Sequence, residues 1–165
     1  MHNEFFFQLT PEKVLEAVEA GGFRPTGHCW ALNSLENRVY DLRLEDDRHV
    51  VVKFYRPGRW SREQILEEHS FLFELRDADI PVCAPLELPA GGTLGEAADI
   101  VFAIWPRTGG RMTDELNEEQ AAILGRLVAR IHNVGAAGPP RHRLELNAES
   151  YGLGPLRNLR ETGHL

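Results

Sequence analysis

The sequence predicts an α+β fold, an antiparallel β-sheet of about five strands with one inserted helix. Residues 38–44 alternate between apolar and polar side chains, and residues 49–55 form the next strand across a polar turn at 45–48. A helix with the capping-box pattern S-x-x-Q begins at Ser61, directly after this β-hairpin. A continuous apolar segment at 100–105 then returns the chain to the sheet.

Size and composition narrow the class of protein. The chain has 165 residues, enough for one domain, and its net charge of −7 argues against nucleic acid or an anionic membrane as the main partner. No apolar run approaches the roughly 20 residues of a membrane-spanning helix, and the first ten residues lack the pattern of a signal peptide. Two cysteines suit a reducing cytoplasm, and seven histidines without ligand spacing predict no metal site. A cytoplasmic protein is therefore expected.

The elements before the hairpin follow from caps and spacing. A short amphipathic helix begins after the Thr10 cap and ends at Gly21-Gly22. Its apolar residues recur at helical spacing, at Val14, Leu15 and Val18. Residues 28–33 are expected to form the strand that precedes the hairpin.

The elements after the hairpin are a helix, a second hairpin and a third helix. The capped helix runs over about residues 61–76. Strands at 85–88 and 100–105, with a turn at 90–93, form the second hairpin, which Pro106 ends. A flexible joint at 107–111 leads to a helix from residue 117 to about 133, whose buried face is expected to carry Ala121, Leu124, Val128 and Ile131. Residues 141–165 show no periodic pattern.

Two charged residues stand where apolar ones are expected. Lys53 follows three valines in the strand at 49–55, where burial of an ammonium group is costly without a negative partner. Glu68 lies within the apolar stripe of the next helix, between Ile65 and Leu72. A Lys53–Glu68 pair resolves both anomalies, and such a pair can hold nucleotide phosphates. The alternatives are a purely structural salt bridge, or a lysine that reaches solvent at the strand edge.

The chain also resembles a known family. The segments S-x-E-N-R-V-Y at 34–40, V-V-K-F-Y-R-P at 51–57 and L-G-R-L-V-A-R-I-H at 124–132 are similar to those of the stress response kinase A family. Its members are bacterial serine/threonine protein kinases with the aminoglycoside-phosphotransferase variant of the kinase fold. The resemblance implies a nucleotide-binding N-lobe with an N-terminal helix at 1–106, followed at 107–165 by a hinge joint and the beginning of a truncated C-lobe with its first helix.

The resemblance also implies roles for individual residues. Lys53 would contact the α- and β-phosphates of ATP, with Glu68, or alternatively Glu67, as its ion-pair partner. The turn at 33–37 would take the place of the glycine-rich loop, with Ser34 and Asn37 as donors to ATP.

The remaining implied contacts concern the adenine. The backbone groups of Ile104 and Trp105 would form the hinge that meets it, next to Pro106.

Parts of the kinase machinery are absent from the sequence. The turn at 33–37 has no G-x-G-x-x-G pattern, and no Walker motif occurs, which excludes a P-loop NTPase as far as motifs can. The family's catalytic aspartate and its magnesium-binding asparagine and aspartate have no counterpart and are expected beyond Leu165. No catalytic residue and no metal ligand is therefore predicted within this chain, although ATP and Mg2+ are the expected cofactors.

Together with the Lys53–Glu68 pattern, the resemblance implies the ATP-binding part of a serine/threonine protein kinase of the stress-response type. In the full-length protein it would transfer the γ-phosphate of ATP to a hydroxyl of a protein substrate, while the fragment itself would be inactive. ATP and that protein are the expected partners, without nucleic acid or membrane. The alternatives are a small-molecule phosphotransferase acting on an aminoglycoside, choline or homoserine, and a non-catalytic interaction domain.

Overall fold

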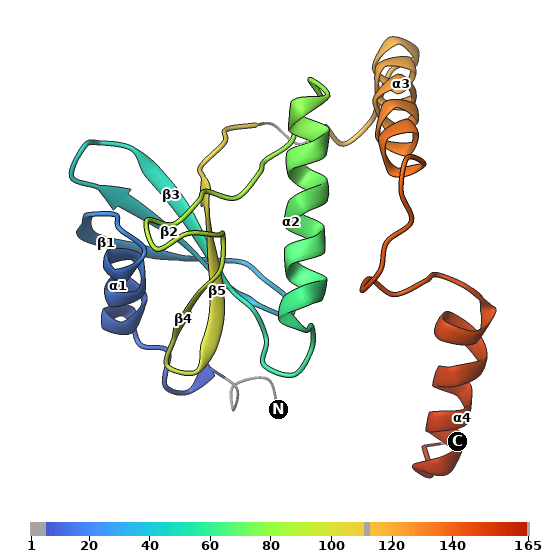
Figure 1. Cartoon of the computed structure of the whole chain (residues 1–165), viewed down its shortest axis with the longest axis horizontal. Helices are drawn as coiled ribbons and strands as arrows, with labels where there is room; N and C mark the ends of the chain where they lie inside the picture. The colour runs from blue at the N-terminus through green and yellow to red at the C-terminus, as the bar shows by residue number, and fades with distance from the viewer. Residues whose placement is uncertain (1–5, 111–112, 165) are drawn as a thin grey trace.

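A computed structural model describes residues 6–110 and 113–164 and shows a five-stranded antiparallel sheet in the order β1-β2-β3-β5-β4 (Figure 1). The elements, in chain order, are α1 (Pro11–Ala20), β1 (Pro25–Leu32), β2 (Arg38–Leu44), β3 (His49–Phe54), α2 (Arg62–Asp77), β4 (Gly95–Ala97), β5 (Ile100–Pro106), α3 (Glu118–Gly135), a π-helical segment (Glu149–Leu153) and α4 (Gly154–Glu161). The predicted α+β class, the first hairpin and the capped helix are confirmed.

The two faces of the sheet are covered by different helices. One face packs on α1 and holds the larger hydrophobic core, to which β3 contributes Val50, Val52 and Phe54. The opposite face meets α2 through a smaller cluster of Tyr55, Ile65 and Ala103. Because side chains alternate along a strand, Lys53 lies on the same face as Tyr55, the face covered by α2.

Helix α2 begins as its sequence predicts. The Ser61 hydroxyl accepts a hydrogen bond from the Gln64 backbone N–H, and the Gln64 side chain accepts one from the Ser61 backbone N–H. This reciprocal pair satisfies two backbone donors that the first turn of the helix leaves free. The cap fixes where α2 begins after β3, and therefore which of its side chains face the sheet.

The second hairpin differs from the prediction. Residues 85–88 do not form a strand, and the partner of β5 is the three-residue β4. Proline at positions 81, 85 and 89 removes backbone donors from the segment, and its Leu86 N–H donates to the Ile104 carbonyl at 2.7 Å. The turn between β4 and β5 is Ala98-Asp99, where both residues have positive φ.

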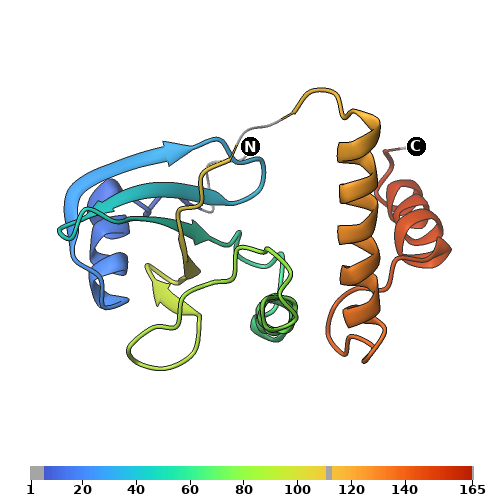
Figure 2. The same cartoon turned by 90° about the horizontal axis from the view of Figure 1, so that it is seen from above.

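The expectation that α3 has a buried face is wrong. None of its described residues is buried, and Leu124 and Val128 are 47% and 40% exposed. Helix α3 stands apart from the sheet, as Figures 1 and 2 show, and touches the end of α2 through Arg130, whose guanidinium donates to the backbone carbonyls of residues 78 and 79. Helical periodicity identifies an apolar stripe, but it does not supply the surface that covers it.

The last part of the chain is more regular than its sequence suggests. Helix α4 and the π-helical segment before it occupy residues 149–161, where no periodic pattern was found. None of the described residues of these two elements is buried. Among the described residues, no helix combines the length and the apolar character needed to cross a bilayer.

Candidate functional site

Lys53 lies in a row of side chains that crosses four strands. The strand register places Leu32 opposite Val39, Val39 opposite Lys53, and Lys53 opposite Ala103. Residues that face each other across antiparallel strands project from the same side of the sheet. The ammonium group is therefore flanked by apolar side chains on both neighbouring strands.

A second row of side chains runs beside the first. Asp41 faces Val51, and Val51 faces Trp105, so these residues share the sheet face of Lys53. Val51 and Trp105 are half-buried, and Leu32 in the first row is 40% exposed. The two rows leave an apolar, half-open sheet surface beside a half-buried cation. Val39 and Val51 were not predicted to belong to a site. The alternation of side chains along their strands indicates that both lie on the Lys53 face of the sheet.

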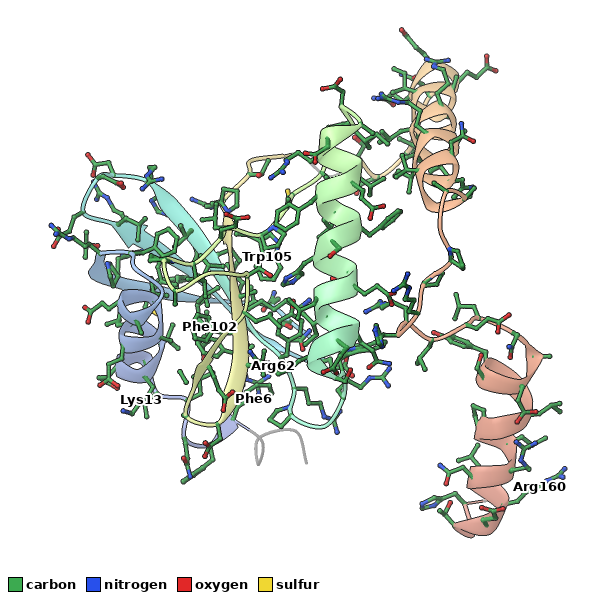
Figure 3. The ribbon with its side chains drawn as sticks, viewed as in Figure 1. Phe6, Lys13, Arg62, Phe102, Trp105 and Arg160 are labelled. Carbon is green, nitrogen blue, oxygen red and sulfur yellow. The ribbon has the colours of Figure 1, made fainter. Side chains whose placement is uncertain are left out.

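The Lys53 ammonium rests on aromatic rings. Its Nζ lies 4.4 Å from the centroid of Tyr55 and 5.7 Å from that of Trp105, within the range of cation–π attraction. Figure 3 shows Trp105 on the side of β5 that faces α2. Burial lowers the pKa of Lys53, while the nearby Glu68 raises this pKa and Arg143 lowers it. The lysine is thus held in a partly dehydrated setting beside both a negative and a positive group.

Glu68 approaches Lys53 but forms its ion pair elsewhere. Its Oε2 lies 2.9 Å from Nη1 of Arg143, and no direct ion pair joins Glu68 to Lys53 within the part of the chain that the structure describes. Glu67, the alternative partner, accepts hydrogen bonds from the backbone N–H groups of residues 141, 142 and 143 at 2.5, 2.8 and 2.7 Å. The predicted residues are therefore brought into one region, with Arg143 as an unforeseen member.

Three buried polar side chains form a hydrogen-bonded group that includes one of the two aromatic rings, Tyr55. The Tyr55 hydroxyl lies 3.1 Å from His69 Nε2, and the Thr93 hydroxyl lies 2.6 Å from His69 Nδ1. Burial lowers the pKa of His69 to about 4 and raises that of Tyr55. His69 is therefore neutral at physiological pH. The sequence reading missed His69, although its position four residues after Ile65 places it on the apolar stripe of α2.

The turn at 33–37 is fixed to the end of β3. The Asn37 side-chain oxygen accepts a hydrogen bond from the Arg56 backbone N–H at 3.1 Å. Glu36 pairs with Arg59, with 2.7 Å between Oε1 and Nε. Ser34 is half-buried in the same turn, while the neighbouring Leu35 is 92% exposed. The structure thus places Ser34 and Asn37 in one turn at the end of the Lys53 strand.

The two predicted hinge residues point to opposite faces of the sheet. The side chain of Ile104 is fully buried in the core beside α1, whereas Trp105 projects to the Lys53 face. The Ile104 carbonyl accepts the N–H of Leu86, so this backbone group already has a partner within the chain. Of the two side chains, Trp105 alone is near the lysine.

The charges of the site suit an anion better than a metal ion. Lys53 and Arg143 bring two cations near one carboxylate, Glu68. Within residues 6–110 and 113–164, no group of three or more histidine, cysteine, aspartate or glutamate side chains could hold a metal. The ammonium group of Lys53 carries N–H donors to which a phosphate oxygen can form charge-assisted hydrogen bonds.

Curated relatives match nearly the whole chain. Stress response kinase A of Salmonella choleraesuis is 42% identical over 150 residues, which cover 90% of this chain and 45% of that protein. Stress response kinase A of Escherichia coli is 39% identical over 155 residues, covering 93% and 47%. A Salmonella typhimurium protein named serine/threonine protein kinase RdoA is 41% identical over 150 residues, covering 90% and 45%. The chain spans about half the length of these relatives.

Solved structures share the fold. An amicoumacin kinase solved with AMP-PNP and Ca2+ gives a TM-score of 0.71 at 19% identity, covering 99% of this chain and 56% of that one. A microcompartment-associated aminopropanol kinase gives 0.69 at 19% identity, covering 90% and 48%. The sheet with helix α2 is thus a protein-kinase-like N-lobe, and the resemblance seen in the sequence is confirmed. Residues 31–161 match the model of the phosphotransferase enzyme family, and the chain belongs to that family.

Proposed function

We propose that this chain is the ATP-binding part of a bacterial serine/threonine protein kinase of the stress-response type. The observation that carries the proposal is the position of Lys53. Its half-buried ammonium group contacts aromatic rings, lies close to Glu68 and is next to a half-open apolar surface of the sheet. An ammonium group in this setting is available to a polyphosphate, and an apolar surface next to it suits a base.

The nucleotide would lie along the two rows of side chains. Its adenine would pack against the apolar surface that includes Val39 and Val51, near the backbone of Ile104 and Trp105. Its α- and β-phosphates would meet Lys53.

The turn at 33–37 would close the phosphate end of the site. The Ser34 hydroxyl and the backbone N–H of Asn37 would donate hydrogen bonds to phosphate oxygens. The Asn37 side chain holds the turn against Arg56 and would therefore keep these donors in place.

Phosphate transfer requires groups that we place in the other half of the full-length protein. Mg2+ would neutralise charge on the phosphates, bound by an asparagine and an aspartate beyond Leu165, and a further aspartate would accept the proton of the substrate hydroxyl. This chain would bind and orient ATP, and by itself it would not transfer phosphate. We also place the protein in the cytoplasm, where its free cysteines Cys29 and Cys83 stay reduced.

The name of one curated relative, serine/threonine protein kinase RdoA, favours a protein as phosphoryl acceptor. The second candidate is a small-molecule phosphotransferase, which the solved kinases named for amicoumacin and aminopropanol favour through their fold alone. Incubation of the full-length protein with labelled ATP, with itself and a generic protein or with a panel of amino alcohols, separates the two. Labelling of protein supports the kinase proposal, and labelling of a small molecule alone overturns it.

ATP binding can be tested on Lys53 with a matched control. The chain has two lysines, and Lys13 lies on α1, paired with Glu16 at 2.6 Å. In calorimetric titration of the full-length protein, Lys53→Ala should weaken ATP binding about tenfold or more, the loss expected for a charge-assisted contact to phosphate. Lys13→Ala should leave the affinity unchanged. Equal ATP binding by wild type and Lys53→Ala would favour a non-catalytic interaction domain, in which the lysine is structural.

A further inference from the structure

The segment 141–143, which follows α3, is attached to α2 by specific contacts. The Glu67 carboxylate accepts three consecutive backbone N–H groups of this segment, at 2.5–2.8 Å. The Gln64 side chain donates to the His142 carbonyl at 3.0 Å. The pKa of the Glu67 carboxyl group is lowered, chiefly by the hydrogen bond that it accepts from the Arg141 N–H. A charged Glu67 therefore holds the segment on the helix.

This attachment places the Arg143 side chain over the site. Its guanidinium lies 4.5 Å from the centre of the Trp60 ring, and its Nη1 lies 2.9 Å from Glu68 Oε2. The side chains of Arg143 and Glu68 are 33% and 35% exposed, so the pair is partly shielded from water. At this degree of burial, water screens the charge of Glu68 less than at a fully exposed position, so its ion pair is stronger than one on an open surface.

Two cations thus stand close to one carboxylate. Lys53 is attracted by Glu68, repelled by Arg143 and attracted by Glu36 of the turn at 33–37. Of the two cations, Arg143 has the direct ion pair with Glu68, and Lys53 rests on the aromatic rings. From this geometry we propose that Arg143 competes with Lys53 for Glu68, so that the segment 141–143 controls formation of the Lys53–Glu68 pair.

The competition would change the environment of Lys53 when a nucleotide binds. With Arg143 on Glu68, the lysine has no carboxylate at ion-pair distance among the described residues and keeps its cation–π contacts. When the segment releases Glu68, the carboxylate can turn to Lys53 and hold it for phosphate binding. This last step rests on the proposed function, whereas the competition itself concerns three side chains of this chain and can be measured without nucleotide.

The competition can be followed through the reactivity of Lys53. Trace acylation over a range of pH, resolved by mass spectrometry, gives the labelling of Lys53 relative to Lys13 in the same sample, and the plateau at high pH corrects for accessibility. Arg143→Met removes the neighbouring positive charge and frees Glu68. The normalised Lys53 labelling at pH 8 should then fall about threefold, as expected for the loss of one partly screened charge.

Three further variants define the effect. Arg143→Lys retains the charge and should restore most of the wild-type profile. Glu67→Gln loosens the segment and should shift the profile in the same direction as Arg143→Met. Arg141→Met removes an exposed charge two residues away but keeps the backbone N–H to Glu67, and should leave the profile unchanged. Circular dichroism verifies that each variant is folded.

The outcomes separate this proposal from the proposed function. If a folded Arg143→Met variant has the wild-type profile of Lys53, the competition is overturned. Addition of ATP and Mg2+ to the wild-type chain should protect Lys53 from acylation and leave Lys13 reactive. If ATP gives no protection while Arg143→Met still shifts the profile, the nucleotide site is overturned and the competition stands.

Discussion

The imidazole of His69 lies edge-on against the indole of Trp105, with 5.6 Å between the ring centroids and 89° between the ring planes. The same imidazole meets the hydroxyls of Tyr55 and Thr93, and its side chain is among the fully buried ones. His69 therefore joins α2 to both aromatic rings that carry the Lys53 ammonium.

Replacement of His69 should destabilise the domain strongly. His69→Ala leaves a cavity and removes the partners of two buried hydroxyls, so we expect the free energy of unfolding to fall by about 3 kcal/mol. Urea denaturation followed by circular dichroism measures this change. His164→Ala, at an exposed position, should alter it by less than about 0.5 kcal/mol. Similar small effects of both substitutions would contradict the structural role of His69.

His69 should also make stability depend on pH. Burial lowers its pKa from 6.5 to about 4, so between these values the unfolded chain binds a proton that the folded chain does not. Stability from this group is therefore complete above about pH 6.5 and is lost as the pH falls toward 4, by about 2 kcal/mol between pH 7.5 and pH 5. Urea denaturation at the two pH values, in wild type and in His69→Gln, isolates this contribution. A wild type and variant with the same pH dependence would show that His69 does not titrate in this way.

Tyr55 and His69 should be energetically coupled. Tyr55→Phe keeps the ring but removes the hydroxyl near His69, at a cost of about 1 kcal/mol in the wild type. In the His69→Ala background the hydroxyl has already lost this partner, so the same change should cost close to nothing. A double-mutant cycle by urea denaturation measures the difference. Tyr151→Phe, at a residue 74% exposed, should be additive with His69→Ala.

Local patterns were sufficient for the elements that surround the lysine. The alternation of residues 38–44 predicts β2 with its observed bounds, and the S-x-x-Q pattern predicts the start of α2. These two elements, with β3 between them, bring Lys53 near Glu68 because a strand and the helix that follows it pack on each other. The neighbourhood of the two residues could therefore be anticipated, since it depends on a short stretch of chain.

The partner of Glu68 could not be anticipated in this way. Arg143 lies 75 residues further along the chain, in a segment without periodicity, and it reaches Glu68 because Glu67 binds the backbone of that segment. Backbone N–H groups are present at every residue but proline, so the sequence does not show which of them will donate a hydrogen bond to a given carboxylate. The two charged residues at apolar positions, and then the resemblance to kinases, suggested Lys53 as the partner, and the described ion pair is with Arg143.

The turn between β4 and β5 offers a test on the part of the sheet that the sequence reading placed wrongly. Ala97 pairs with Ile100, so Ala98 and Asp99 form a two-residue turn, with φ of 51° and 60°. Positive φ at both positions favours Asn-Gly, and an alanine there is strained by about 1 kcal/mol. The double change Ala98→Asn and Asp99→Gly should therefore raise the free energy of unfolding by about 1 kcal/mol, measured by urea denaturation. Ala98→Val, which places a β-branched side chain at positive φ, should lower it by a similar amount, about 1 kcal/mol. Changes of the same sign in both variants would show that this turn does not limit the pairing of β4 with β5.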